Sequence, residues 1–301
     1  MRSEYQARAK RIPEFHSGSI KLSQAGAEIW VPDGVSEAAA LKRVTHLCVA
    51  AHQDDVEIMA LEGILAGFGR SDQWFAAVIV TDGAGSPRGG LYAGYTDRQM
   101  QTVRQAEQKK AAFVGEYSAV ALLNHPSSAV KSSANPGPQS DLKALLAAAR
   151  PQIVYTHNLA DKHDTHVAVA LRTVAAIREF PANERPGKLY GCEVWRDLDW
   201  MVDRDKVVFR LGERENIAAS LVGVFDSQIA GGKRYDLATL GRRRAHATYY
   251  QSHAVDLAQG MNFAVDLTAL IENERLDPAE YIGGFIQRFA EDVNDRVKKF
   301  A

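Results

Sequence analysis

Four short apolar runs recur along the first half of the chain. They are HLCVAA (46–51), WFAAVIVT (74–81), AVALLN (119–124) and QIVYTHN (152–158). Continuous runs of this length are typical of strands that are buried on both faces of a sheet. The pattern therefore predicts at least four buried strands.

The stretches between these runs have helical spacing. Residues 56–69 place their apolar side chains on one stripe, and residues 97–117 have the length and composition of an amphipathic helix ended by Gly115. Two further helical stretches precede Pro151 and Pro181. Strands that alternate with helices predict an α/β fold, with a mostly parallel sheet covered by helices on both faces. After residue 200 strand and helix patterns no longer alternate clearly. The charged stretch that follows predicts a C-terminal helical extension.

Composition narrows the class of protein. The chain has 301 residues, of which 46% are hydrophobic, and its 36 Lys and Arg against 37 Asp and Glu give a formal charge of −1. These values are typical of a globular protein, and no overall positive field favours nucleic acid. Two isolated cysteines give no disulfide framework, no apolar leader opens the chain, and no run is long enough to span a bilayer. We expect a cytoplasmic protein that binds no nucleic acid and has no transmembrane segment. Any membrane contact would be peripheral, and a homo-oligomer is possible.

Polar residues with metal-binding chemistry follow two of the predicted strands. Because ligands of a parallel sheet bind at the carboxyl ends of its strands, these residues are the first candidates for a site. They are His52, Asp54, Asp55 and Glu57 after the first run, and His163 and His166 after the fourth. Imidazoles and carboxylates are the ligands of catalytic Zn²⁺. Helix capping by the two aspartates and surface positions for the histidines are the structural alternatives; His125 and His157 also follow apolar runs and could line the pocket.

Two motifs resemble those of the LmbE-like, or PIG-L, zinc-dependent de-N-acetylases. AHQDDVEIMA (51–60) is similar to the family's A-H-P-D-D-x-E signature, and KHDTHVAVA (162–170) is similar to its H-P-D-H motif. VTDGAGS (80–86), an R-x-x-E frame that starts at Arg104, and FDSQIAG (225–231) add weaker similarity. The resemblance extends over residues 44–231, and it implies a Rossmann-like fold.

The resemblance also implies roles for individual residues. His52, Asp55 and His166 would hold one Zn²⁺ per chain, although another divalent metal stays open. Asp54 would be the general base for the attacking water, and His163 would face the developing oxyanion. Arg104, and with it Arg88 of the Gly-rich loop at 82–95, would contact the substrate.

The chain departs from the family pattern at two positions. Gln53 replaces a common proline, and Thr165 replaces the carboxylate that usually precedes the last histidine. Asp164 or Asp161 could then supply the acceptor that fixes the imidazole of His166. Whether Thr165 lowers activity stays open.

The sequence therefore predicts a hydrolase that removes the acetyl group from an N-acetylated amino sugar of the N-acetylglucosamine type, or from its conjugate. An amidase for another N-acyl small molecule is one alternative. A non-catalytic nucleotide- or ligand-binding module is the other, although DGAGSPRGG lacks the G-x-G-x-x-G spacing. We expect an N-terminal extension at 1–43, the deacetylase domain at 44–231, and a C-terminal extension at 232–301 that packs on the same domain.

Overall fold

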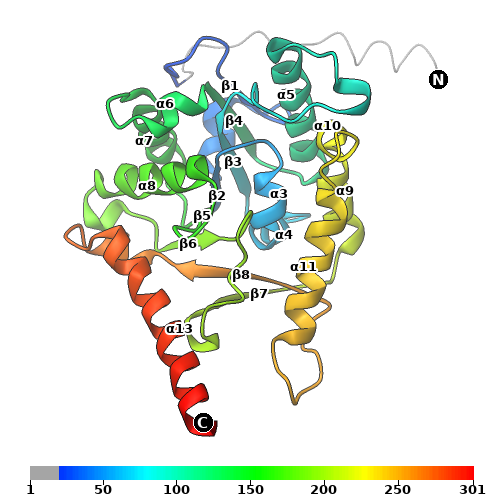
Figure 1. The fold of residues 1–301 in the computed structure, drawn as a ribbon. Coiled ribbons are helices and arrows are strands. Elements are labelled where there is room, and N and C mark those ends of the chain that lie inside the picture. Colours follow the sequence, from blue (N-terminus) through cyan, green and yellow to red (C-terminus); the bar gives the residue numbers. More distant parts are fainter. Residues whose placement is uncertain (1–19) are drawn as a thin grey trace.

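The computed structural model describes residues 20–301, which form an eight-stranded sheet with helices on both faces (Figure 1). Part of the predicted N-terminal extension, residues 1–19, lies outside the described residues. The strands are β1 (Glu28–Trp30), β2 (His46–Ala50), β3 (Phe75–Thr81), β4 (Ala119–His125), β5 (Ile153–His157), β6 (Lys188–Cys192), β7 (Val207–Leu211) and β8 (Gly260–Asp266). The helices are α2 (Glu37–Lys42), α3 (Asp55–Met59), α4 (Leu61–Gly67), α5 (Asp97–Val114), α6 (Ser127–Lys131), α7 (Gly137–Ala149), α8 (Asp164–Arg178), α9 (Glu215–Gly223), α10 (Asp226–Ile229), α11 (Tyr235–Tyr249), α12 (Thr268–Glu272) and α13 (Pro278–Phe300).

The sheet is mostly parallel, as the apolar runs predict. Its strand order is β1-β4-β3-β2-β5-β6-β8-β7, and the five strands from β4 to β6 run parallel to one another. β1 pairs antiparallel with β4 at one edge, while β8 and β7 extend the other edge antiparallel. Residues of β2, β3 and β4 are almost wholly buried, which agrees with a sheet covered on both faces.

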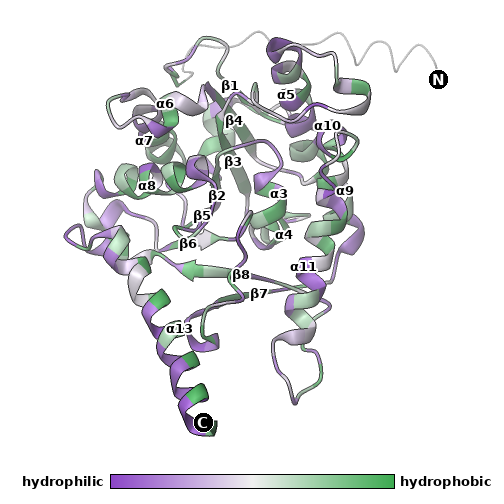
Figure 2. Ribbon diagram, viewed as in Figure 1, coloured by the Kyte–Doolittle hydropathy of each residue, from purple (hydrophilic) through white to green (hydrophobic). Residues whose placement is uncertain are grey.

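Two large apolar cores and a small cluster around Leu41 fill the space between the sheet and its helices. One lies under α7, α8 and α12, and includes Leu142, Val169 and Ile177. The other lies under α3, α4 and α9, and includes Ile64 and Leu221. Figure 2 shows the apolar residues concentrated on the strands and on the helix faces turned toward them.

Several elements differ from the sequence-based expectation. The single helix expected at 56–69 is two helices, α3 and α4, which meet at Ala60. β1, β6, β7 and β8 were not predicted, and β8 places part of the expected C-terminal extension inside the sheet. The helical character of that extension is confirmed by α11 and α13, and in Figure 1 α13 projects away from the sheet. The boundary between residues 231 and 232 stays a prediction.

None of the described helices combines the length and the apolar composition that a helix needs to cross a bilayer.

Candidate metal centre

The predicted site lies where the sheet reverses its strand order. β2 and β5 are neighbours, but the chain continues from β2 to β3 on one side and from β5 to β6 on the other. Loops that leave these two strands diverge and leave a crevice between them, the usual ligand position in open α/β sheets. His52 follows β2 and His166 begins α8 after β5, so both motifs reach this crevice.

Three predicted ligand atoms form a nearly equilateral triangle. His52 Nδ1 lies 3.2 Å from Asp55 Oδ2 and 3.1 Å from His166 Nε2, and the last two atoms are 3.3 Å apart. Tetrahedral zinc with bonds of about 2.0–2.1 Å requires ligand atoms about 3.3 Å apart. The observed spacing therefore fits a single tetrahedral ion with one position left over.

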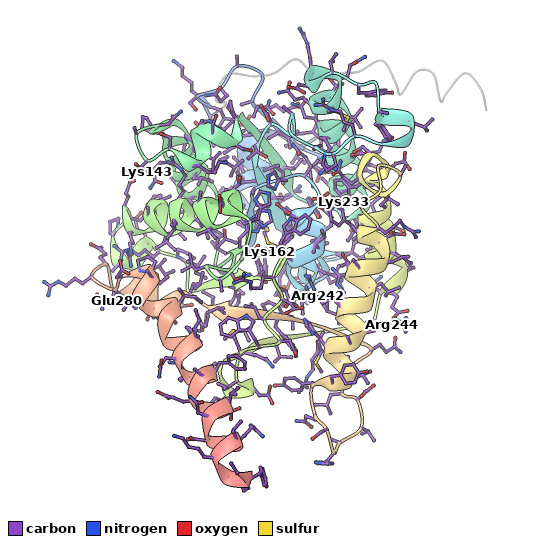
Figure 3. All side chains as sticks on the ribbon, viewed as in Figure 1. Lys143, Lys162, Lys233, Arg242, Arg244 and Glu280 are labelled. Carbon is purple, nitrogen blue, oxygen red and sulfur yellow. The ribbon has the colours of Figure 1, made fainter. Side chains whose placement is uncertain are left out.

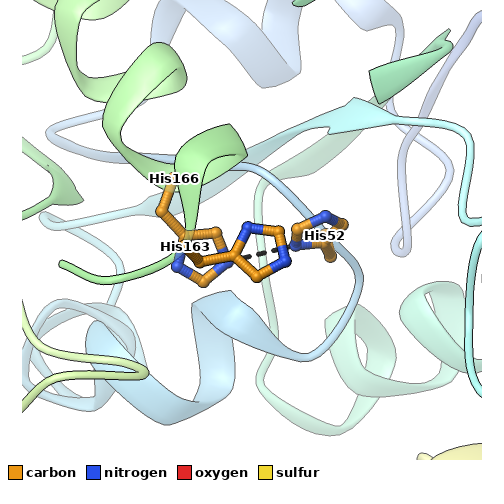
Figure 4. A group of neighbouring side chains, drawn as sticks. All are labelled: His52, His163 and His166. Carbon is orange, nitrogen blue, oxygen red and sulfur yellow. Dashed lines mark hydrogen bonds between the residues drawn. The ribbon is translucent and has the colours of Figure 1, made fainter. Parts of the chain in front are cut away.

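Two further histidines, His163 and His157, lie close to these three ligand atoms. Among the described residues, His52, His163 and His166 form one cluster whose ligand atoms lie within 4.8 Å of one another (Figure 4), and Asp55, His157 and His166 form a second. His157 is fully buried, and its Nε2 accepts a hydrogen bond from the backbone N–H of Ala51 at 2.9 Å. That bond occupies the lone pair which His157 would need for a metal, so His157 fits a supporting position better than a ligand position.

Asp161 supplies a carboxylate behind His166. Its Oδ2 lies 3.3 Å from His166 Nδ1, while its Oδ1 accepts from the backbone N–H of His163 at 3.0 Å. Although burial disfavours the charged imidazole, Asp55 and Asp161 raise the pKa of His166 to about 9. Asp164, the other candidate, is exposed. Of the two candidates, Asp161 is therefore the one that contacts the ring of His166.

Asp54 faces the crevice beside the triangle. It begins α3 in a left-handed conformation, with φ 85°, and its side chain makes no capping bond, so the structural alternative of helix capping does not hold for it. Such a conformation costs about 1–2 kcal/mol for a residue other than glycine. Burial raises the pKa of Asp54 to about 6, even though Arg104 favours the ionised form.

Arg104 holds Asp54 from behind. The guanidinium is 1% exposed; its Nη2 donates to Asp54 Oδ2 at 2.9 Å and to the backbone carbonyl of Gln53. Its Nη1 donates to Glu107 at 3.3 Å, and Glu107 in turn accepts from the backbone and hydroxyl of Ser227, each at 2.7 Å. The hydrogen bonds that the structure shows for Arg104 are thus with the carboxylate of Asp54 and its supports, and its contact with the substrate stays a prediction.

A cavity of about 350 Å³ opens above these residues. Its wall includes His52, Asp54, Asp55, Thr81, Asp82, Gly83, Arg104, Ser127, Lys131, His163, Thr165, Trp195, Gln228, Lys233 and Tyr235. Gly83, with φ 75°, is required here because a side-chain carbon would come within 2.7 Å of Gln53 Oε1. Arg88 is not part of this wall; its Nη2 donates to the carbonyl of Ala84 and pairs with Asp97. Its predicted substrate contact stays a prediction.

Sequence reasoning missed several residues of the wall. Trp195 and Tyr235 come from segments without a motif, and Lys233 follows the FDSQIAG element by two residues. The arginine-rich segment of α11 is outside the wall: Arg242 donates to the carbonyl of Val194, and Arg244 pairs with Glu215. These arginines hold neighbouring segments together.

The region of the chain that carries both motifs of this site matches a known protein family. Residues 47–177, which contain both motifs, match the model of the PIG-L family, GlcNAc-PI de-N-acetylase. The resemblance of both motifs to the PIG-L family is thus confirmed, over residues 47–177. No curated protein matches the sequence.

Solved structures share the fold of this chain at low identity. The conserved protein TT1542 from Thermus thermophilus is 18% identical with a TM-score of 0.56, over 74% of this chain and 94% of that one. N,N'-diacetylchitobiose deacetylase from Pyrococcus horikoshii is 13% identical with a TM-score of 0.56, over 77% and 86%. GalB, the 4-carboxy-2-hydroxymuconate hydratase from Pseudomonas putida KT2440, is 15% identical with a TM-score of 0.53, over 75% and 96%. These likenesses confirm the α/β fold, and a fold shared by deacetylases and a hydratase does not decide the reaction.

Proposed function

We propose that the chain is a metal-dependent hydrolase that removes the acetyl group from an N-acetylated amino sugar of the N-acetylglucosamine type, or from its conjugate. The observation that carries the proposal is the triangle of ligand atoms with a buried carboxylate, Asp54, beside it in one cavity. The family match and the fold shared with a chitobiose deacetylase support the reaction class.

His52, Asp55 and His166 would hold the metal, with Zn²⁺ the first candidate and one ion per chain. A divalent ion at this point supplies Lewis acidity, which polarises an amide carbonyl and lowers the pKa of water. Asp161 orients the ring of His166 by accepting at Nδ1, so that Nε2 faces the other two ligand atoms.

Asp54 is the general base of the proposal. Its carboxylate lines the cavity next to Asp55, and Arg104 fixes one oxygen. Asp54 would accept a proton from the attacking water and pass it to the amine as the C–N bond breaks. A base that serves both steps must lie within hydrogen-bond reach of the reacting atoms.

His163 would stabilise the oxygen of the amide as negative charge develops on it. Burial, together with the neighbouring His166, lowers the pKa of His163, so the ring is neutral at pH 7 and carries one N–H. The ring lies 5.0 Å from that of His52 and lines the same cavity. A neutral N–H donor placed there stabilises an oxyanion without a further proton transfer.

The experiment replaces Asp54 by Asn, which tolerates the left-handed conformation and keeps the size of the side chain. Metal-replete Asp54→Asn should lose at least about 100-fold in kcat for release of acetate from N-acetylglucosamine or its conjugates, while it keeps one metal per chain. Asp82→Asn, which changes another carboxylate of the same wall, is the matched control and should keep most of the activity.

Three outcomes would count against the proposal. Full activity of Asp54→Asn would remove the assigned base. Hydrolysis of other N-acyl compounds, but of no amino sugar, would move the chain to the amidase alternative. A wild-type protein that binds no metal after zinc supplementation, yet is stabilised by a nucleotide, would favour the binding module.

A further inference from the structure

A second cavity, of about 240 Å³, lies between α4, α9 and α11, next to the edge strand β7. Most of its wall is apolar, and the larger apolar side chains are Leu61, Leu65, Leu211, Val222, Leu237 and Leu240. Leu237 is 56% exposed and Leu240 is 44% exposed, so the cavity reaches the surface beside these two leucines. It shares no lining residue with the cavity of the candidate metal centre. A ligand bound here would therefore be a molecule apart from the substrate of that centre.

Arg243 brings a buried positive charge to this cavity. The residue lines the wall and is only 6% exposed. Its Nε donates to Asn262 Oδ1 at 3.0 Å, and its Nη2 donates to two backbone carbonyls of α3. Its Nη1 makes no hydrogen bond within residues 20–301, and unlike Arg104 Nε it is not completely enclosed by protein. The cavity is therefore the space that this free donor faces.

The two carboxylates of the wall do not neutralise Arg243. Glu215 pairs with Arg244 at 2.9 Å, and Asp236 pairs with Arg234 at 2.8 Å. Figure 3 shows Arg244 on the outer side of α11, away from the sheet. Both pairs are largely exposed, so they belong to the mouth of the cavity. Neither carboxylate is left to pair with the buried guanidinium.

Buried Glu193 acts on Arg243 only at a distance. Its carboxylate accepts from two backbone N–H groups and lies 3.0 Å from His246 Nε2, and in the described part of the chain no hydrogen bond joins it to Arg243. Burial lowers the pKa of Arg243 to about 10, although Glu193 favours the charged form. The guanidinium is therefore charged at pH 7, and a buried charge without a bonded counter-ion is unfavourable. An anion in the cavity would supply that partner.

We propose that this cavity binds a medium-chain carboxylate, with the carboxylate on Arg243 Nη1 and the alkyl chain against Leu61, Leu65 and Val222. A guanidinium and a carboxylate form a charge-assisted hydrogen bond, and burial of the chain adds the hydrophobic contribution. An apolar cavity of about 150 Å³ stays dry and binds benzene, so by the same ratio a cavity of about 240 Å³ has room for about eight to ten carbons. Octanoate has both the charge and the chain length that the site requires.

The test measures binding to the full-length, zinc-loaded protein by calorimetry at pH 7. The probes are octanoate, 1-octanol and acetate, and we expect one octanoate per chain. 1-Octanol keeps the chain and lacks the charge, so it should bind about ten-fold more weakly. Acetate keeps the charge and lacks the chain, so it should bind at least about 100-fold more weakly, because it buries almost no apolar surface.

Variants of the wall test the position of the ligand. Ala218→Leu, on α9, extends a side chain into the cavity and should weaken octanoate binding at least about ten-fold. Ser220→Leu places the same side chain on the same helix at an exposed position outside the wall, and it should bind octanoate like wild type. Arg243→Gln should remove the preference for octanoate over 1-octanol. If Arg243→Gln does not fold, Ala218→Leu and the comparison of probes still decide the question.

A carboxylate can also bind a metal, so a further variant separates the two positions. Asp55→Asn removes one ligand of the candidate metal centre and should bind octanoate as wild type does. Loss of octanoate binding in this variant would place the ligand at the metal centre and overturn the inference. Equal affinity for octanoate and 1-octanol, or undiminished octanoate binding by Ala218→Leu, would overturn it as well. None of these measurements involves hydrolysis, so they are independent of the success or failure of the proposed function.

Discussion

Asp161 illustrates how a single carboxylate can set the properties of the centre. Its two oxygens bind the ring of His166 and the backbone of His163, so it fixes both residues of the second motif. Partners of this kind typically contribute about 10- to 100-fold to metal affinity. The sequence left this role open between Asp161 and Asp164, because Asp161 precedes the motif and Thr165 stands where the family carries its carboxylate.

We expect Asp161→Asn to weaken zinc binding by about 10- to 100-fold, since the amide keeps an acceptor but loses the negative charge. Competition with a chromogenic chelator measures the affinity. Asp164→Asn makes the same change three residues away on an exposed side chain, and it should leave the affinity unaltered. Equal effects of the two substitutions would show that general charge, and not the contact with His166, controls the metal.

Glu62 provides a pH-dependent effect outside the metal centre. Its carboxyl accepts a hydrogen bond from Tyr155, and burial raises the pKa of Glu62 above its ordinary value. The folded protein therefore holds this proton more tightly than the unfolded chain, so the stability contributed by Glu62 is greatest in acid. It is lost as pH rises through the unfolded pKa and then the higher folded pKa.

Glu62→Gln keeps an acceptor for Tyr155 and removes the titration. Relative to wild type, the variant should become progressively more stable as pH rises from about 4.5 to about 8, as measured by urea unfolding at each pH. A difference between the two proteins that stays constant over this range, or falls with pH, would contradict the assignment.

Helix α3, which carries Asp55 at its first turn, is held at its other end by a distant residue. Arg243 of α11 is buried, and its Nη2 donates to the backbone carbonyls of Glu57 at 2.8 Å and Ile58 at 3.1 Å. Asn262 of β8 donates to the same Ile58 carbonyl at 3.2 Å. These donors satisfy carbonyls at the end of a five-residue helix, and they connect α11 and β8 to the metal centre.

Removal of this connection should affect the metal as well as stability. We expect Arg243→Gln to lower zinc affinity about ten-fold, in the range of other supporting contacts. Arg178, at the opposite end of α8 from His166, makes comparable bonds to the carbonyls of Leu270, Asn273 and Leu276. Arg178→Gln should therefore destabilise the fold to a similar degree and leave zinc affinity unchanged. If both variants bind zinc like wild type, α3 needs no support from α11.

The sequence predicted the elements that depend on local signals and missed those that depend on distant contacts. α5 ends at Val114 with Gly115 as its cap, as expected, because that signal is local. The stripe at 56–69 predicted one helix, but Arg243 and Asn262 take its carbonyls from positions about 200 residues away, which no local period records. β7 and β8 pair antiparallel without a short turn between them, so they lack the hairpin signal that would predict them.

Some residues of the candidate site were likewise predicted from local motifs, and others were not. The two motifs and their order predicted the residues that now form the ligand triangle, because each motif is local and the sheet brings strand ends together. Trp195, Lys233 and the buried position of His157 depend on tertiary packing, and the sequence offers no spacing rule for them. The cluster of candidate ligands could thus be predicted from the chain, but the shape of the cavity could not.

At the scale of the whole molecule, the centre joins the two halves of the sheet. His52 and Asp55 belong to the half that contains β2, β3 and β4, while His166 follows β5 in the other half. The ligand atoms come within 3.3 Å of one another across the crevice although 114 residues separate His52 from His166. An ion that binds this arrangement has no equivalent site in the unfolded chain, so its binding must stabilise the whole fold.

Zinc at about 100 times its dissociation constant should raise the free energy of unfolding by about 2.7 kcal/mol, because the ion binds the folded state alone. In a melting experiment the midpoint should rise by several degrees and return to its starting value when a chelator is added. Asp55→Asn removes the only carboxylate of the triangle and should abolish most of the shift, whereas Asp72→Asn, an exposed aspartate paired with Arg70, should preserve it. An undiminished zinc shift in Asp55→Asn would place the ion elsewhere, and the two halves of the sheet would then not be joined through this centre.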